Sequence, residues 1–433
     1  MHIRAGLMKV SSSRGWVALV VVMAVLLTVV PAAAAATVAR SSAPTARFAT
    51  FNASLNRNAP GQLIANLSTS DDAQAQAVAE IIQRTQPDVL LVNEFDFDPG
   101  GEAVALFQHN YLSVGQNGAD PITYPYRIAV PSNTGVLSGF DLDKDGVVAT
   151  PADIGTAAYS NDSWGFGAFE GQFAFAVFSK FPILEDQIRT FQQFLWKDMP
   201  GALLPVDPNT GELYYSSEIL EQFRLSSKNH ADIPIRIGSQ TVHFLVSHPT
   251  PPVFDGPEDR NGTRNHDEIR FWADYVSPGR NRYIYDDAGQ RGGLKPGAKF
   301  VIAGDQNSDP FDGDSIPGSA QLLLDNPHIN TKVTPSSEGA VDRAVAQNQN
   351  NDDHISDPAF DTADFSEASF GGPGNLRADY VLPSKSLQIR DAAVFWPADD
   401  DPLSRLTGPG FPAVSSDHRL VWVDVSHGGF PRR

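Results

Sequence analysis

The sequence predicts a layered domain of mixed β-strands and α-helices, for three reasons. Short apolar runs of strand length recur along the chain. Two stretches carry apolar residues at helical spacing, and several strand runs begin or end at a residue capable of acid–base or metal chemistry. Of the 433 residues, 41% are hydrophobic and 10% aromatic, so the chain can bury a large core, which excludes global disorder.

The composition excludes several classes of site. The chain contains no cysteine, which rules out disulfides, zinc sites made of thiolates and a cysteine nucleophile. It carries 32 Lys and Arg against 51 Asp and Glu, a formal net charge of −19. This acidic balance argues against a protein that holds nucleic acid by charge alone, and it is compatible with the binding of divalent cations.

Residues 1–36 are typical of a secretory signal peptide. The apolar run Trp16–Val30 is preceded by basic residues and followed by an alanine tract with an A-x-A cleavage pattern. A membrane anchor is the alternative, but the run falls short of the roughly 20 apolar residues that span a bilayer. The sequence therefore predicts a secreted protein without a stable membrane anchor after cleavage. Residues 37–433 are then expected to form a single domain with polar insertions near 121–162 and 326–374.

The mature chain contains two predicted helices. The first spans 70–86, where Ser70 can cap the helix and Pro87 ends it. The second spans 267–276, with apolar residues on one side. Strands are predicted over 48–51, 89–92, 173–178, 242–246, 300–303, 380–382 and 420–425.

Polar residues collect at the ends of these predicted strands. If the last two strands run antiparallel to the earlier ones, the end of one strand lies beside the start of the next, and all these residues share one rim of the sheets. Carboxylates at this density repel one another unless a cation lies between them, and oxygen ligands suit Mg²⁺ or Mn²⁺ better than zinc. The residues after a strand are Asn52, Glu94, His248, Asp305 and Asn307, and those before one are Asp379, Asp417 and His418.

At these positions the chain resembles the endonuclease/exonuclease/phosphatase, or DNase I-like, superfamily, as a secreted, bacterial-type member. The matching motifs, in order, are F-N, P-D-V-L-L-V-N-E, S-H-P, G-D-Q-N, A-D-Y-V and S-D-H, and they cover about 45–425. The resemblance implies an α+β four-layer sandwich, in which two mainly antiparallel sheets pack face to face with helices outside. One departure is Gln306 inside G-D-x-N, whose side chain we expect to point away from the rim.

The resemblance also implies a metal site. Asn52, Glu94 and Asp417 would hold the cation, directly or through water. The expected cation is Mg²⁺ or Mn²⁺. It would stabilise the charge that builds up on the non-bridging oxygens during attack on phosphorus.

The catalytic roles implied by the resemblance fall on five residues. Asp305 would orient or deprotonate the attacking water, and Asn307 would steady that water or the phosphate. His418 would contact the phosphate and be oriented by Asp379. His248 would contact the phosphate or act as general acid, but the sequence places no acidic partner for it.

The predicted function is that of a secreted, divalent-metal-dependent phosphoesterase acting on phosphodiesters or phosphomonoesters through activated water. The substrate is a small organophosphate or a nucleic acid, and no protein partner is indicated. One alternative is an extracellular nuclease, which needs a positive groove that the net charge disfavours. The second alternative is a non-catalytic binding protein that retains the fold.

Two weaker features complete the predicted set. Arg224, Lys228 and His230 form a basic group in F-R-L-S-S-K-N-H, and we consider a phosphate contact against ordinary surface charge. A structural Ca²⁺ loop is the second feature, because D-x-D-x-D-G starts like an EF-hand loop but lacks the acidic residue at its twelfth position. Its residues are Asp141, Asp143 and Asp145.

Overall fold

The structure is a computed structural model that describes residues 45–347, 351–365, 372–408 and 413–430. Residues 43–433 form one compact unit. The predicted signal peptide, 1–36, lies outside the described residues. Within the described parts of the chain, no helix is long and apolar enough to cross a membrane.

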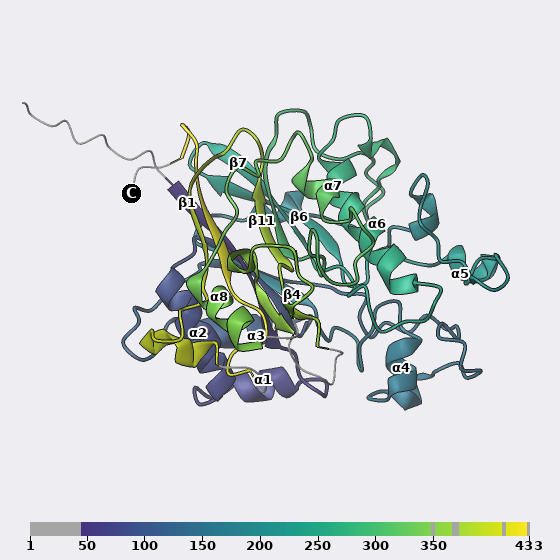
Figure 1. Ribbon diagram of the computed structural model, residues 1–433, viewed down its shortest axis with the longest axis horizontal. Coiled ribbons are helices and arrows are strands. Elements are labelled where there is room, and N and C mark those ends of the chain that lie inside the picture. Colours follow the sequence, from purple (N-terminus) through teal and green to yellow (C-terminus); the bar gives the residue numbers. More distant parts are fainter. Residues whose placement is uncertain (1–44, 348–350, 366–371, 409–412, 431–433) are drawn as a thin grey trace, which may run out of the picture. The chain divides into compact units, whose positions relative to one another are not determined.

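Two large sheets form the centre of this unit (Figure 1). The six-stranded sheet has the order β12 (Gln388–Val394), β13 (Val421–Ser426), β1 (Thr45–Leu55), β2 (Val89–Phe95), β4 (Phe175–Ser179) and β3 (Tyr126–Val130). The five-stranded sheet has the order β11 (Asp379–Pro383), β8 (Lys299–Asp305), β7 (Gln240–Ser247), β6 (His230–Ile237) and β5 (Arg189–Thr190). A small two-stranded sheet joins β10 (Gly374–Leu376) and β9 (Ala363–Phe365).

The strand directions confirm the arrangement that brings the polar strand ends together. β1 runs parallel to β2 and antiparallel to β13, while β7 runs parallel to β8 and β8 antiparallel to β11. The C-terminal ends of the earlier strands therefore meet the start of β11 and the segment before β13 at one rim. The register sets Asp379 directly opposite Asp305.

Three apolar clusters define the layers. One cluster lies between the sheets and contains side chains of both, such as Phe48 and Phe244, whose rings lie 5.6 Å apart. A second joins the outer face of the six-stranded sheet to α1 (Gln62–Leu67), α2 (Ala73–Thr85) and α3 (Glu102–Phe107). A third joins the five-stranded sheet to α6 (Arg260–Tyr275) and α7 (Gln321–Leu324) (Figure 1). This is the four-layer α+β sandwich that the sequence predicts.

Both predicted helices exist but begin elsewhere. α2 begins at Ala73 because Asp72, not Ser70, accepts the backbone N–H of Ala75 and caps it. α6 begins at Arg260 rather than at residue 267. The prediction missed the first two turns of α6 because they carry polar residues on every side. The polar side chains on their buried face make hydrogen bonds instead of apolar contacts.

The two predicted insertions contain regular structure. The stretch 121–162 includes β3, an edge strand of the six-stranded sheet, and α4 (Ala157–Asn161). The stretch 326–374 includes α8 (Glu338–Gln347) and β9, so it is not a bare loop. A further short helix, α5 (Ser217–Leu220), precedes β6. Single-turn helices span Gln108–Leu112, Pro151–Asp153, Glu185–Gln187, Trp196–Asp198, Asn281–Tyr283, Pro358–Phe360 and Pro402–Leu406.

Candidate active site

Asp305 lies at the centre of the polar rim. Its side chain is 1% exposed, yet side chains of three other segments reach its Oδ2: Asn52 on β1, His248 just after β7 and His418 just before β13. The amide nitrogen of Asn52 donates to it at 3.1 Å. The Nε2 atoms of His248 and His418 lie 3.3 and 3.5 Å away. Four separate segments of the chain therefore converge on one buried carboxylate.

The glycine before Asp305 explains why the G-D-x-N motif fits this place. Gly304 has φ +148°, and a Cβ built on it would lie 2.0 Å from the carbonyl oxygen of Ser247 on β7. Only glycine allows the two parallel strands to approach so closely at the rim. On the other side of Asp305, its Oδ1 accepts the backbone N–H of Asn307 at 2.8 Å. The Gln306 side chain points away from the rim and donates to Ser247 Oγ, as the sequence predicts.

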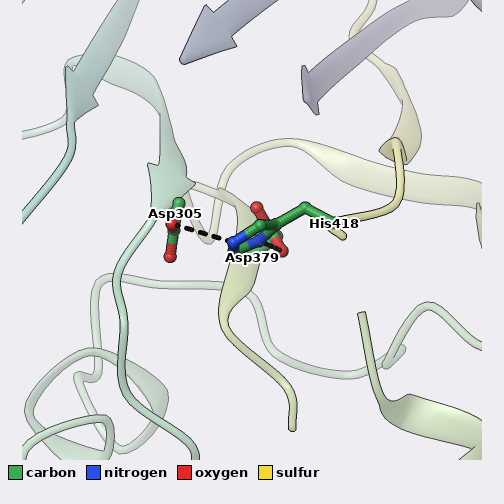
Figure 2. A group of neighbouring side chains, drawn as sticks. All are labelled: Asp305, Asp379 and His418. Atoms are coloured by element: carbon green, nitrogen blue, oxygen red, sulfur yellow. Dashed lines mark hydrogen bonds and ion pairs between the residues drawn. The ribbon is translucent and has the colours of Figure 1, made fainter. Parts of the chain in front are cut away.

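His418 lies between two carboxylates, as Figure 2 shows. Its Nδ1 is 2.9 Å from Asp379 Oδ2, which also accepts the Thr362 hydroxyl at 2.8 Å. Burial alone would lower the pKa of His418, but Asp379 and Asp305 raise it well above its ordinary value. His418 is therefore a cation at neutral pH, with its ring orientation set by Asp379. Thr362 is a site residue that the sequence did not indicate, because a single threonine in a loop carries no signal.

Asp305 is ionised for the complementary reason. Burial acts to raise the pKa of its carboxyl, but the adjacent His418 and His248 hold that pKa below its ordinary value. An ionised carboxylate can hold and orient a water molecule, and it can accept a proton from that water once the water has become acidic by bonding to phosphorus.

The three residues predicted to hold the metal lie beside this cluster. The Asn52 amide donates to Glu94 Oε1 at 3.1 Å, and Ser54 Oγ donates to Asp417 Oδ1 at 3.2 Å. Burial, followed by the charge of Asp417, raises the pKa of Glu94 to about 7. The backbone of Glu94 has φ +57°, which is uncommon for a residue other than glycine. Glu94, whose pKa the charge of Asp417 helps to raise, and Asp417 itself form a carboxylate pair that fits a hard cation.

A second group also has the spacing of ligands. One donor atom each of Asp305, Asp379 and His418 lie within 4.8 Å of one another. These atoms already face each other, since His418 directs its two nitrogens at the two carboxylates. Because these nitrogens already lie against the oxygens of Asp305 and Asp379, the pair Glu94 and Asp417 is the better place for a cation. Asn52 would offer its oxygen to a cation beside Glu94 only after its amide turns over, because its Nδ2 and not its Oδ1 now faces Glu94.

His248 differs from His418 in its charge. Burial, followed by the nearby Lys228, lowers the pKa of His248 to about 4, so the imidazole is neutral at pH 7. Its Nδ1 is buried and has no hydrogen-bond partner among the described residues. The sequence placed no acidic partner for this histidine, and the described structure shows none at Nδ1. Asn307, half-buried with φ +50°, donates its amide to the Pro249 carbonyl at 3.1 Å, beside His248.

The three predicted basic phosphate residues lie in different places. Lys228 is 7% exposed and close enough to Glu94 and Asp305 to interact with their charges. Arg224 instead donates to Asn133 Oδ1 at 2.6 Å, away from the cluster. His230 is fully buried, with Nδ1 against Ser226 Oγ and Nε2 against the Glu268 carbonyl. A phosphate contact by His230 is therefore wrong, because β6 begins at this residue and directs the ring onto α6.

The acidic loop near residue 141 adopts the turn that its motif predicts. One oxygen each of Asp141, Asp143 and Asp145 lie within 4.8 Å of one another. Asp141 accepts the backbone N–H of Gly146 at 2.9 Å, and Asn161 donates to Asp143 at 2.6 Å. The cluster is partly exposed, so binding of Ca²⁺ there stays a prediction.

Comparison with known proteins identifies the family. A sequence model described as the Endonuclease/Exonuclease/phosphatase family matches residues 49–418. No curated protein matches the chain. Similar solved structures include an endonuclease/exonuclease/phosphatase from Beutenbergia cavernae (16% identity, TM-score 0.46, covering 90% of this chain and 73% of that one). Two others are beta toxin 275-280 from Staphylococcus aureus (14%, 0.42, 87% and 99%) and sphingomyelinase C from Streptomyces griseocarneus (13%, 0.40, 89% and 100%).

The family match covers every residue placed in the cluster, from Asn52 to His418. It also accounts for the order in which the motifs occur along the chain. The chain belongs to the endonuclease/exonuclease/phosphatase family, whose members are hydrolases that act on phosphoester bonds with divalent metals.

Proposed function

We propose that this protein hydrolyses phosphodiester or phosphomonoester bonds with the help of a divalent metal ion. The observation that carries the proposal is the environment of Asp305. A buried carboxylate that faces an amide, a cationic imidazole and a neutral imidazole has the parts needed to hold water beside a phosphate.

In the proposed reaction, Asp305 holds a water molecule for attack on phosphorus and accepts its proton as the new P–O bond forms. The ester P–O bond on the opposite side breaks. His418, kept cationic by Asp379, donates from Nε2 to a non-bridging oxygen and stabilises its charge. Neutral His248 donates a second hydrogen bond to the phosphate, and the nearby Lys228 contributes positive charge.

Glu94 and Asp417 are the proposed ligands of the cation, with Asn52 as a third, directly or through water. A bound Mg²⁺ or Mn²⁺ would supply Lewis-acid stabilisation of the phosphate oxygens. A carboxylate-rich oxygen donor set supports these ions over zinc.

Secretion and a small organophosphate substrate complete the proposal. Secretion is supported by the signal-peptide pattern of 1–36. The formal net charge of −19 works against a nucleic-acid backbone as substrate, whereas a small phosphate ester needs no extended positive groove.

The test compares bis-p-nitrophenyl phosphate with p-nitrophenyl phosphate in the presence of Mg²⁺, Mn²⁺ or Ca²⁺, with a chelator as control. The proposal is supported if wild type hydrolyses an ester, the chelator stops the reaction, and Asp305→Ala does not hydrolyse it. The ester that reacts faster shows whether the protein is a diesterase or a monoesterase. Cleavage of single- or double-stranded DNA in preference to both esters would favour a nuclease. Absence of turnover with every metal and substrate, including DNA, would favour a binding protein that retains the fold.

A further inference from the structure

Glu268 is a fully buried carboxylate on α6, outside the cluster described above. Its Oε1 accepts the backbone N–H of Ser227 at 2.6 Å and the Ser227 hydroxyl at 3.0 Å. Its Oε2 accepts the backbone N–H of Thr250 at 2.7 Å. One side chain thus satisfies three donors from two segments that are distant in sequence.

Those two segments carry site residues. Ser227 immediately precedes Lys228, just before β6, and Thr250 follows His248 by two residues, just after β7. Further contacts join the segments to each other, since Ser227 Oγ reaches the His248 carbonyl at 3.5 Å and Lys228 Nζ reaches the Pro249 carbonyl at 3.4 Å. Glu268 therefore fixes the main chain beneath both Lys228 and His248.

The position of the main chain is decisive for His248. Most site histidines are oriented by a partner on the second ring nitrogen, as His418 is by Asp379. Among the described residues, His248 has no such partner at Nδ1. Its ring is in contact with Asp305 only through Nε2, at 3.3 Å, so its orientation also depends on where its backbone is held.

Groups close to Glu268 offset the cost of burying its negative charge. Burial raises the pKa of this carboxyl, and Arg264 and Lys228, together with the two backbone N–H groups, oppose that rise. The adjacent Asn265 extends the same buried face of α6, because its amide donates to the carbonyls of Thr250 and Gln306 at 2.8 and 2.9 Å. α6 is thus a common support for the ends of β7 and β8.

We propose that Glu268 is a positioning residue of this site, whose carboxylate joins the segments before β6 and after β7 and so places Lys228 and His248 against the substrate phosphate. The proposal rests on the proposed function for its kinetic consequence. Its structural consequence, the placement of the His248 ring, is independent of turnover.

The test compares Glu268→Gln with Asp267→Asn. Asp267 is a matched control because it is the neighbouring residue on α6, is equally buried, and accepts the Trp196 indole and the Leu203 backbone N–H, both at 2.7 Å. Trp196 and Leu203 lie shortly before Lys228 in the sequence but are not site residues. The other contact of Asp267, His266 Nδ1 at 3.1 Å from its Oδ1, is made by the neighbouring residue on α6 and is not in the site either. Both variants lose a buried acceptor, so both are expected to melt at lower temperature.

Two readouts are taken on folded wild type and both variants. The first is the ¹⁵N signal pair of His248 in histidine-labelled protein, assigned by its absence in His248→Asn. The second is kcat and KM for the ester that wild type hydrolyses. Glu268→Gln is expected to shift the His248 signals and to lower kcat/KM by about 10- to 100-fold, the range seen when partners of site residues are removed. Asp267→Asn is expected to leave the His248 signals where they are in wild type and kcat/KM within about twofold of wild type.

Unchanged His248 signals in Glu268→Gln, or equal changes in the two variants, would overturn the proposal and leave Glu268 a purely structural residue. If Glu268→Gln does not fold, Ser227→Ala is read in the same way, because it removes only the hydroxyl that links the carboxylate to the His248 carbonyl. Absence of turnover in wild type would instead refute the proposed function, and the His248 signals would still decide the role of Glu268.

Discussion

The replacement Asp379→Asn tests whether His418 acts as a cation. The change preserves the size of the side chain, and the new amide can keep an oxygen towards His418 Nδ1 and Thr362. Its NH₂ group then occupies the position of Oδ1, which has no hydrogen-bond partner among the described residues. What the variant loses is the negative charge, 2.9 Å from the imidazole.

The size of that loss follows from the distance. Two unit charges 2.9 Å apart interact by about 6 kcal/mol at an effective dielectric constant of about 20. A neutral hydrogen bond retains about 1 kcal/mol of this, so about 5 kcal/mol is lost at most. At about 1.4 kcal/mol per unit, the pKa of His418 falls by up to about 3.5 units, so the ring loses its proton at a much lower pH than in wild type.

The assay follows the His418 titration by NMR with metal removed, and kcat between pH 5 and 9 with Mg²⁺. We expect kcat at pH 8 to fall about 100- to 1,000-fold, the usual cost of losing one donor to a developing negative charge. The loss relative to wild type should shrink as the pH is lowered, because His418 becomes protonated again. Asp286→Asn is the control, since Asp286 is a buried ion-pair partner of Arg189 outside the site. A His418 pKa within one unit of wild type, or a kcat within about threefold at pH 8, would refute the reasoning.

Four further predictions concern other parts of the structure. Asp305→Ala should reduce turnover at least about 1,000-fold without unfolding the protein, and loss of the circular dichroism signal or full activity would contradict its assigned role. His230 has a pKa of about 3 in the fold because it is buried, against about 6.5 in the unfolded chain. Its contribution to the free energy of unfolding is thus intact above pH 6.5 and lost as the pH falls. In urea titrations, His230→Gln should reduce the slope of the free energy of unfolding against pH by about 1 kcal/mol per pH unit between pH 6 and 4. An unchanged slope would refute this. Glu80→Gln should cost about 1.5 kcal/mol in the same titration, because it removes the charge from the acceptor of Arg405, which donates to Glu80 at 3.0 Å and is half exposed; a cost below about 0.5 kcal/mol would show the pair to be dispensable. Calorimetry should detect Ca²⁺ binding that Asp143→Asn weakens at least tenfold, and identical heats would eliminate the calcium loop.

The rim of polar residues was predictable because it depends on strand direction alone. Each apolar run ends or begins at a polar residue, and alternating directions bring such positions together whatever the lengths of the intervening loops. Asp305 and Asp379, 74 positions apart in sequence numbering, face each other in register as a result. The sequence could not show which oxygen faces which nitrogen, since that depends on packing around each ring.

Proximity in sequence grouped Lys228 with His230, but the two side chains lie in different places. Lys228 precedes β6 and is free of strand alternation, so its side chain can turn towards the cluster. His230 belongs to the strand, and its side chain must face α6, where Phe271 and Trp272 lie against it. The start of α6 escaped prediction for a related reason, because its buried polar residues find their partners in segments that no local pattern reveals.

The pairing of β1 with β13 has a consequence for how the protein is made. β1 lies in the interior of its sheet, yet one of its two neighbours is formed by nearly the last described residues, with Thr45 opposite Ser426. During synthesis, that edge of β1 stays unpaired until residues 421–426 have been made, and His418 is added only shortly before them. A chain stopped short of β13 therefore lacks both a closed sheet and a complete cluster. The cluster of Asp305, Asp379 and His418 is therefore assembled only in a chain that has completed the six-stranded sheet.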